Sequence, residues 1–163
     1  MDLNKLSTSD KVIAGSGLVL FIAYFLPWFE VSVEGIEGIP GTGGSATANG
    51  SDVDFLWSTL PMLIGLVMAG VIIASKLFDV KLPDLPVTWG QAHLVLGCLA
   101  AFLVVLKLLI GEDSGFGFEV SRSFGLFLAA LAAIGLAVGG FLMFKSGEDA
   151  APAAGDGTGS APF

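Results

Sequence analysis

The stretch VIAGSGLVLFIAYFLPWF, residues 12–29, decides the expected fold, because it contains no charged residue. A helix of about 20 apolar residues, rising about 1.5 Å per residue, crosses a hydrocarbon core of about 30 Å. We therefore expect residues 12–29 to form a membrane-spanning helix that ends near Pro27, since proline disfavours helix in the residue before it.

Three later stretches repeat this pattern, at residues 55–77, 89–110 and 123–144. The sequence therefore predicts an all-α integral membrane four-helix bundle. Residues 1–11 would be a polar lead in which Ser7 and Asp10 match a capping box, and residues 12–145 the four-span domain. Residues 146–163, rich in Ala, Gly and Pro, are expected to be a disordered tail. In the first long connection, residues 30–54, Val31 and Val33 alternate with polar residues and suggest a short strand.

The composition supports a membrane protein and argues against binding to nucleic acid. Of the 163 residues, 54% are hydrophobic and 13% charged, and the formal net charge is −8. A soluble domain carries about 25% charged residues, and a nucleic-acid-binding surface needs clustered Lys and Arg. We therefore expect the lipid bilayer, and no nucleic acid, to be a partner.

The segments LSTSDK (residues 6–11) and FLPWF (residues 25–29) together resemble uncharacterised small four-span membrane proteins of actinobacteria and related high-GC bacteria. The resemblance covers about the first 30 residues and the general layout. It implies no activity and no catalytic residues.

Basic residues near the ends of the spans predict the orientation. Five would lie on one side (Lys5, Lys11, Lys76, Lys81 and Lys145), and two, Lys107 and Arg122, on the other. The side richer in Lys and Arg is normally cytoplasmic. The sequence therefore predicts a multi-pass protein of the plasma membrane with both termini in the cytoplasm.

Lys107 is the charged residue that lies inside an apolar stretch. A charge within a membrane is costly and suggests a function by default, such as transport or gating. Lys107 is also about one turn from the end of its span, so its side chain could reach the headgroups or pair with Glu112 or Asp113.

Small residues spaced four apart predict close helix packing, because helices in lipid associate mainly through van der Waals contact. The pairs are Gly65 with Ala69, Gly97 with Ala101, and Gly135 with Gly139. They could serve packing within this chain or a face reserved for another chain. Four aromatic residues suit a headgroup belt: Tyr24, Trp28, Trp57 and Trp89.

No catalytic, metal or cofactor site is predicted. His93 is expected at the membrane interface and Cys98 as a small packing residue, and Asp52 and Asp54 fall short of the six to eight oxygens that calcium prefers. The leading hypothesis is a non-enzymatic accessory, assembly or scaffold subunit that contacts other membrane chains or itself through helix faces and outer loops. The alternative is a small oligomeric channel or transporter.

Overall fold

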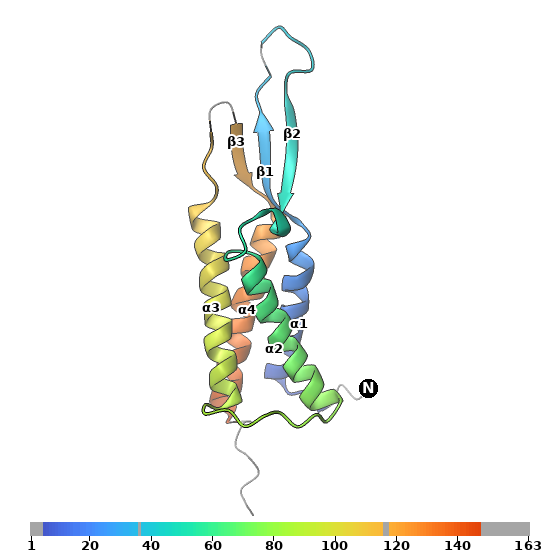
Figure 1. Cartoon of the computed structure of the whole chain (residues 1–163), viewed down its shortest axis with the longest axis vertical. Coiled ribbons are helices and arrows are strands. Elements are labelled where there is room, and N and C mark those ends of the chain that lie inside the picture. Colours follow the sequence, from blue (N-terminus) through green and yellow to red (C-terminus); the bar gives the residue numbers. More distant parts are fainter. Residues whose placement is uncertain (1–4, 36, 116–117, 148–163) are drawn as a thin grey trace, which may run out of the picture.

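The computed structural model describes residues 5–35, 37–115 and 118–147, and in these ranges it holds four α-helices and one three-stranded antiparallel sheet (Figure 1). The elements in chain order are α1 (Thr8–Tyr24), β1 (Pro27–Val33), β2 (Gly44–Asn49), the 3-10 helix η2 (Gly50–Asp52), α2 (Thr59–Leu77), α3 (Trp89–Ile110), β3 (Phe118–Arg122) and α4 (Phe124–Ser146). The predicted tail after residue 147 lies outside the described residues, and so does Ile36.

The prediction of an all-α fold is wrong, because the chain combines helices with a sheet of order β2-β1-β3. The sequence suggests one short strand between residues 30 and 54. The structure has two strands around that connection, and a third, Phe118–Arg122, in the connection before α4. β1 pairs antiparallel with both neighbours, so that Val31 lies opposite Ala46 on one side and Val120 on the other.

The prediction of four apolar spans is also wrong. Among the described residues, three helices are long and apolar enough to cross a membrane: α2, α3 and α4. The helix in the first stretch, α1, has 17 residues, begins with Asp10 and Lys11 in its first turns and ends at Tyr24. Residues 27–29, which were expected to complete a first span, belong to β1 instead.

Side-chain caps explain where two of the helices begin. Ser7 Oγ accepts a hydrogen bond from the Asp10 N–H, and Asp10 Oδ2 accepts one from the Ser7 N–H, which confirms the predicted capping box. Thr88 and Gln91 form the same reciprocal pair before α3. Such pairs satisfy backbone N–H groups that have no partner within the helix.

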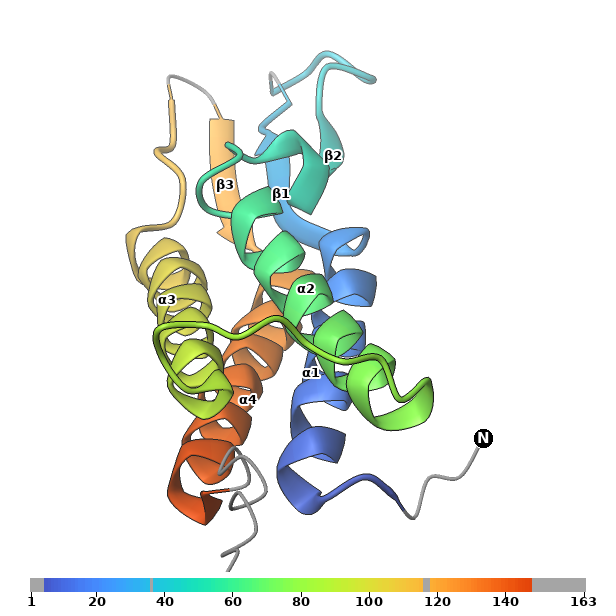
Figure 2. The same cartoon turned by 60° about the horizontal axis from the view of Figure 1, so that its bottom comes forward.

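The four helices lie side by side, and the sheet extends from one end of this helical bundle (Figures 1 and 2). The beginning of α1, the end of α4 and the connection between α2 and α3 lie at the opposite end. We call these the sheet end and the lysine end, since five lysines (Lys5, Lys11, Lys76, Lys81 and Lys145) belong to the second.

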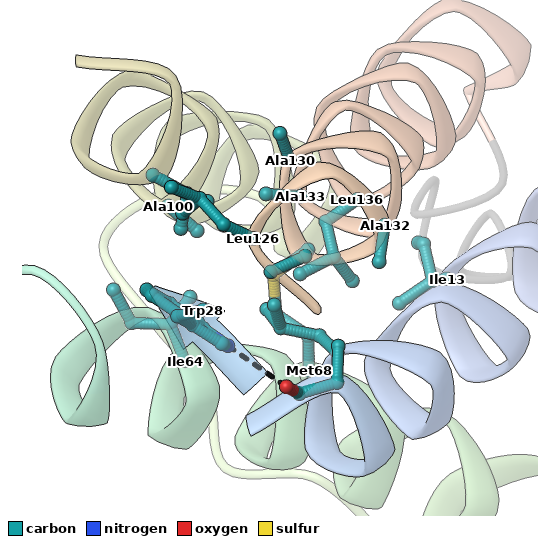
Figure 3. Packing of buried hydrophobic residues seen from close by; sticks show 14 of the residues in the cluster. Ile13, Trp28, Ile64, Met68, Ala100, Leu126, Ala130, Ala132, Ala133 and Leu136 are labelled. Carbon is teal, nitrogen blue, oxygen red and sulfur yellow. Dashed lines mark hydrogen bonds between the residues drawn. The ribbon is translucent and has the colours of Figure 1, made fainter. Parts of the chain in front are cut away.

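Helix α4 packs against both α1 and α3, with small side chains at the contacts. Half of its most apolar stretch is buried (50%), against 39% in α2 and 33% in α3. Figure 3 shows Ala130, Ala132, Ala133 and Leu136 of α4 in the core with Ile13 and Ala100. The core is therefore built around α4.

Glycines allow backbones to approach closely in this core. A Cβ on Gly97 would lie 2.6 Å from the Leu136 carbonyl oxygen, and one on Gly139 would lie 2.6 Å from Ile13 Cγ1. A Cβ on Gly135 would overlap the Ser16 hydroxyl, and Gly65 faces Leu136 and Leu20. Ala69 is buried and Ala101 packs at the edge of the core. All six predicted packing residues thus lie at or beside contacts within this chain.

We expect Gly97→Ala to destabilise the protein by about 1–3 kcal/mol, because the added methyl meets backbone atoms of α4 that cannot rotate away. Gly70→Ala is the matched control. Gly70 is exposed on α2, and no atom lies within 4 Å of the place that a methyl group would take there. The better helix propensity of alanine should therefore leave stability unchanged or raised. The stabilities of both variants are measured by SDS unfolding in mixed micelles, with circular dichroism as the readout. Equal stability of the two variants would contradict this packing.

Candidate functional site

Strand β1 joins the sheet to the helical bundle through two consecutive buried residues. Trp28 is 0% exposed and Phe29 is 2% exposed. Side chains in a strand normally alternate between faces, but the pairing of β1 with β2 shifts register between Pro27 and Phe29. This irregularity lets both rings enter the core.

The Trp28 indole also contacts the end of α1. Its Nε1–H donates to the Ala23 carbonyl at 2.8 Å, the bond drawn as a dashed line in Figure 3. The Ala23 carbonyl also accepts from the Leu26 N–H at 3.1 Å, so the indole adds a second donor to the turn that ends α1. Trp28, which the sequence suggested for a headgroup belt, therefore closes the core at the sheet end. Tyr24, Trp57 and Trp89 are half-buried, and the Tyr24 hydroxyl lies 3.2 Å from Thr59 Oγ1.

Lys107 lies beneath the sheet and forms one of the two predicted ion pairs. Its side chain is 7% exposed, and Nζ is 2.6 Å from Glu112 Oε1. The ammonium also lies 5.7 Å from the centre of the Phe29 ring, within range of a cation–π contact. Asp113 is exposed and makes no ion pair with any described residue. Lys107 therefore links α3 to the connection after it and to β1.

Arg122, which the sequence marked only as an indicator of orientation, ties β3 to the end of α3. Its Nε–H donates to the Leu108 carbonyl at 2.6 Å, and Nη2 donates to the Leu109 carbonyl at 3.0 Å. The adjacent Ser123 N–H donates to the Trp28 carbonyl at 2.8 Å. No sequence spacing marks this role, because the two elements meet only through the fold.

Beyond these anchors, the sheet carries mostly exposed side chains. Asp52 Oδ2 accepts a hydrogen bond from the Asn49 N–H, so this carboxylate caps η2 rather than facing Asp54. Within the ranges that the structure describes, no three His, Cys, Asp or Glu side chains are grouped as a metal site would require.

A cavity of about 320 Å³ opens at the lysine end, between α2, α3, α4 and the connection that joins α2 to α3. Its lining residues are Val71, Ile72, Ser75, Lys76, Val80, Leu82, Trp89, His93 and Met143. Apolar walls with a few polar groups are typical of small-molecule sites.

His93, which was expected at the membrane interface, is buried in the wall of this cavity at the lysine end. It is 3% exposed, and Nδ1 lies 2.8 Å from the Trp89 carbonyl oxygen. A carbonyl can only accept, so Nδ1 carries a hydrogen, and in the uncharged form of the ring Nε2 is an acceptor. Nε2 has no hydrogen-bond partner among the described residues. A buried polar atom without a partner is uncommon and calls for an explanation.

Lys76 lines the cavity and lies near Asp10, whereas the sequence marked Lys76 only as an indicator of orientation and Asp10 only as a helix cap. Lys76 Nζ lies 3.9 Å from Asp10 Oδ2, at the outer limit of an ion pair. Asp10 is fully buried, and its Oδ1 has no hydrogen-bond partner in the described part of the chain. The capping box was the available signal for Asp10, whereas its contact with α2 depends on packing.

Cys98 is exposed on α3.

No protein-family model, curated protein or solved structure matches this chain.

We expect Glu112→Gln to destabilise the protein more than Lys107→Met does. The first change leaves the buried ammonium without its anion, whereas the second leaves a carboxylate that is 42% exposed and can be hydrated. Breaking a buried pair costs about 3–5 kcal/mol, and the exposure of Glu112 should reduce this to about 3 kcal/mol or less. The stability of the double variant Lys107→Met/Glu112→Gln should be close to that of Lys107→Met alone. Unfolding by SDS measures all three stabilities.

Asp113→Asn is the matched control for the loss of an acid from the same connection. It should leave stability unchanged, because exposed charges without a close partner contribute little. Equal effects of Glu112→Gln and Asp113→Asn would show that the pair does not hold the sheet end together.

Proposed function

We propose that this chain is a non-enzymatic integral membrane protein, an accessory, assembly or scaffold subunit that presents its sheet to another membrane protein chain. The observation that carries the proposal is the three-stranded sheet, with β2 and β3 as its edge strands, tied to an apolar helical bundle through Trp28, Lys107 and Arg122. A sheet anchored in this way is a rigid surface for a partner.

Strand β2 is the edge that best suits an added strand. Its sequence, GSATAN, contains no charged residue and no proline. Soluble proteins usually protect sheet edges with charges, prolines or short strands, because an unprotected edge pairs with other chains. The other edge, β3, is shorter and carries Glu119 and Arg122. We therefore propose that an extended segment of the partner pairs with β2, as in known modes of strand addition.

The proposed orientation places the sheet outside the plasma membrane and the lysine end, with both termini, in the cytoplasm. The two basic residues near the sheet are both engaged, Lys107 with Glu112 and Arg122 with carbonyls of α3. Four of the five lysines at the lysine end are exposed (Lys5, Lys11, Lys81 and Lys145). Exposed lysines near span ends favour the cytoplasmic side.

A small oligomeric channel or transporter has less support. Gly135 and Gly139 of α4 pack against α1, so these residues are used within the chain. Lys107 pairs with Glu112 under the sheet. Lys107, which suggested transport or gating from sequence, and the small residues of α4, which could have formed a face for another chain, therefore both have a structural use within this chain.

A photo-crosslinking amino acid at Ser45, on β2, should capture a discrete partner in native membranes, to be identified by mass spectrometry. Thr47→Lys should abolish that crosslink, since a charge on an edge strand opposes pairing. Glu119→Lys on β3 is the matched control and should leave it unchanged. Ser45, Thr47 and Glu119 are all exposed, so these changes should not unfold the sheet.

The same crosslinker at Leu131, which is 67% exposed on α4, reports contacts through the helix face. Crosslinks from Leu131 with none from Ser45 would contradict a role for the sheet. A protein that runs as a lone monomer and yields no crosslink from either position would contradict the accessory-subunit proposal as a whole.

A further inference from the structure

We propose that the cavity at the lysine end binds the headgroup of an anionic phospholipid that also carries hydroxyl groups, as phosphatidylglycerol does. Lys76 would bind the phosphate and His93 would accept a hydrogen bond from a headgroup hydroxyl. This proposal concerns the end of the molecule opposite the sheet and does not depend on the proposed partner.

Lys76 supplies the positive charge. Its side chain lines the cavity and is 38% exposed. The 3.9 Å separation from Asp10 Oδ2 exceeds a hydrogen-bond distance, and Asp10 Oδ2 already accepts from the Ser7 N–H at 3.0 Å. Among the described residues, no hydrogen bond uses the three donors of this ammonium, so they can bind phosphate oxygens. The nearby carboxylate holds the ammonium beside the cavity.

His93 supplies an acceptor that the protein leaves unused. The bond from Nδ1 to the Trp89 carbonyl fixes both the tautomer and the ring orientation. Nε2 lies on the opposite edge of the ring, is buried and has no partner in the described part of the chain. Both side chains line the same cavity, so a headgroup whose phosphate contacts Lys76 lies beside the His93 ring, and its hydroxyl can donate to Nε2 once the atoms that cover this nitrogen move aside.

The remaining walls point to a lipid rather than a soluble anion. Val71, Ile72 and Met143 make the deeper wall apolar, and α2 and α3 are long and apolar enough to cross a membrane. The cavity thus lies where such helices reach the headgroup region. The surrounding lysines add a general attraction for anionic lipids of about 1 kcal/mol for each residue near the surface.

The test uses the full chain in a non-ionic detergent, with thermal unfolding as the readout and dioctanoyl phosphatidylglycerol as the probe. The lipid should raise Tm in a saturable way. Dioctanoyl phosphatidylcholine, with no net charge and no hydroxyl in its headgroup, and inorganic phosphate should not do so at the same concentrations. Lys76→Gln and His93→Phe should each weaken the apparent affinity about 10-fold, since each loses one hydrogen-bonding contact with the ligand.

Lys81→Gln is the matched control, because Lys81 is exposed on the connection beside the cavity and does not line it. The affinity of the Lys81→Gln protein for dioctanoyl phosphatidylglycerol should equal that of the wild type. Val80→Phe fills the cavity from the connection without removing a polar group, so it should abolish binding while Tm without lipid is retained. This variant keeps the test decisive if His93→Phe fails to fold.

Three results would overturn the proposal. Equal weakening by Lys76→Gln and Lys81→Gln would show general electrostatic attraction in place of a site. Equal binding of the two lipids would remove the role of the charged, hydroxyl-bearing headgroup. Saturable stabilisation by inorganic phosphate alone would assign the cavity to an anion taken from water.

Discussion

Burial of Trp28 and Phe29 is the constraint on which the rest of the structure depends. The two rings turn the end of an apolar stretch into the first residues of a strand, and the Trp28 indole donates to a carbonyl in the last turn of α1. Because β1 is the central strand, its position fixes β2 on one side and β3 on the other. The sheet is thus an extension of the helical core and not a separate loop domain.

Charged side chains have different surroundings at the sheet end and at the lysine end. At the sheet end, Lys107 and Arg122 are held by a carboxylate and by helix carbonyls, which makes them structural. At the lysine end, the ion pair of Lys5 with Asp79 is exposed, and Lys76 is only loosely paired with Asp10. The donors left available there, together with the free nitrogen of His93, distinguish that end as the place for a ligand.

The sequence correctly predicted some features that depend on residues close together in the chain, such as a helix range and a helix cap. The range of α3 agrees with residues 89–110, and the Ser7–Asp10 capping box forms, because apolar length and caps act between near neighbours. The strands were largely missed, since pairing such as Val31 with Val120 joins residues far apart in the chain. Trp28 was misplaced because an aromatic residue after a proline looks the same in a headgroup belt and in a core. The burial of His93 and Asp10 likewise depends on helices that meet only in the fold.

The most direct test of this account is the side of the membrane on which each end lies. In a Cys98→Ala background, cysteine placed at Ser45 or at Ser146 is treated with a maleimide that cannot cross the membrane. Intact cells should label the Ser45→Cys protein, whereas the Ser146→Cys protein should react only after the cells are made permeable. The reverse pattern, or a protein that stays soluble without detergent, would contradict a sheet held outside the membrane by an apolar bundle.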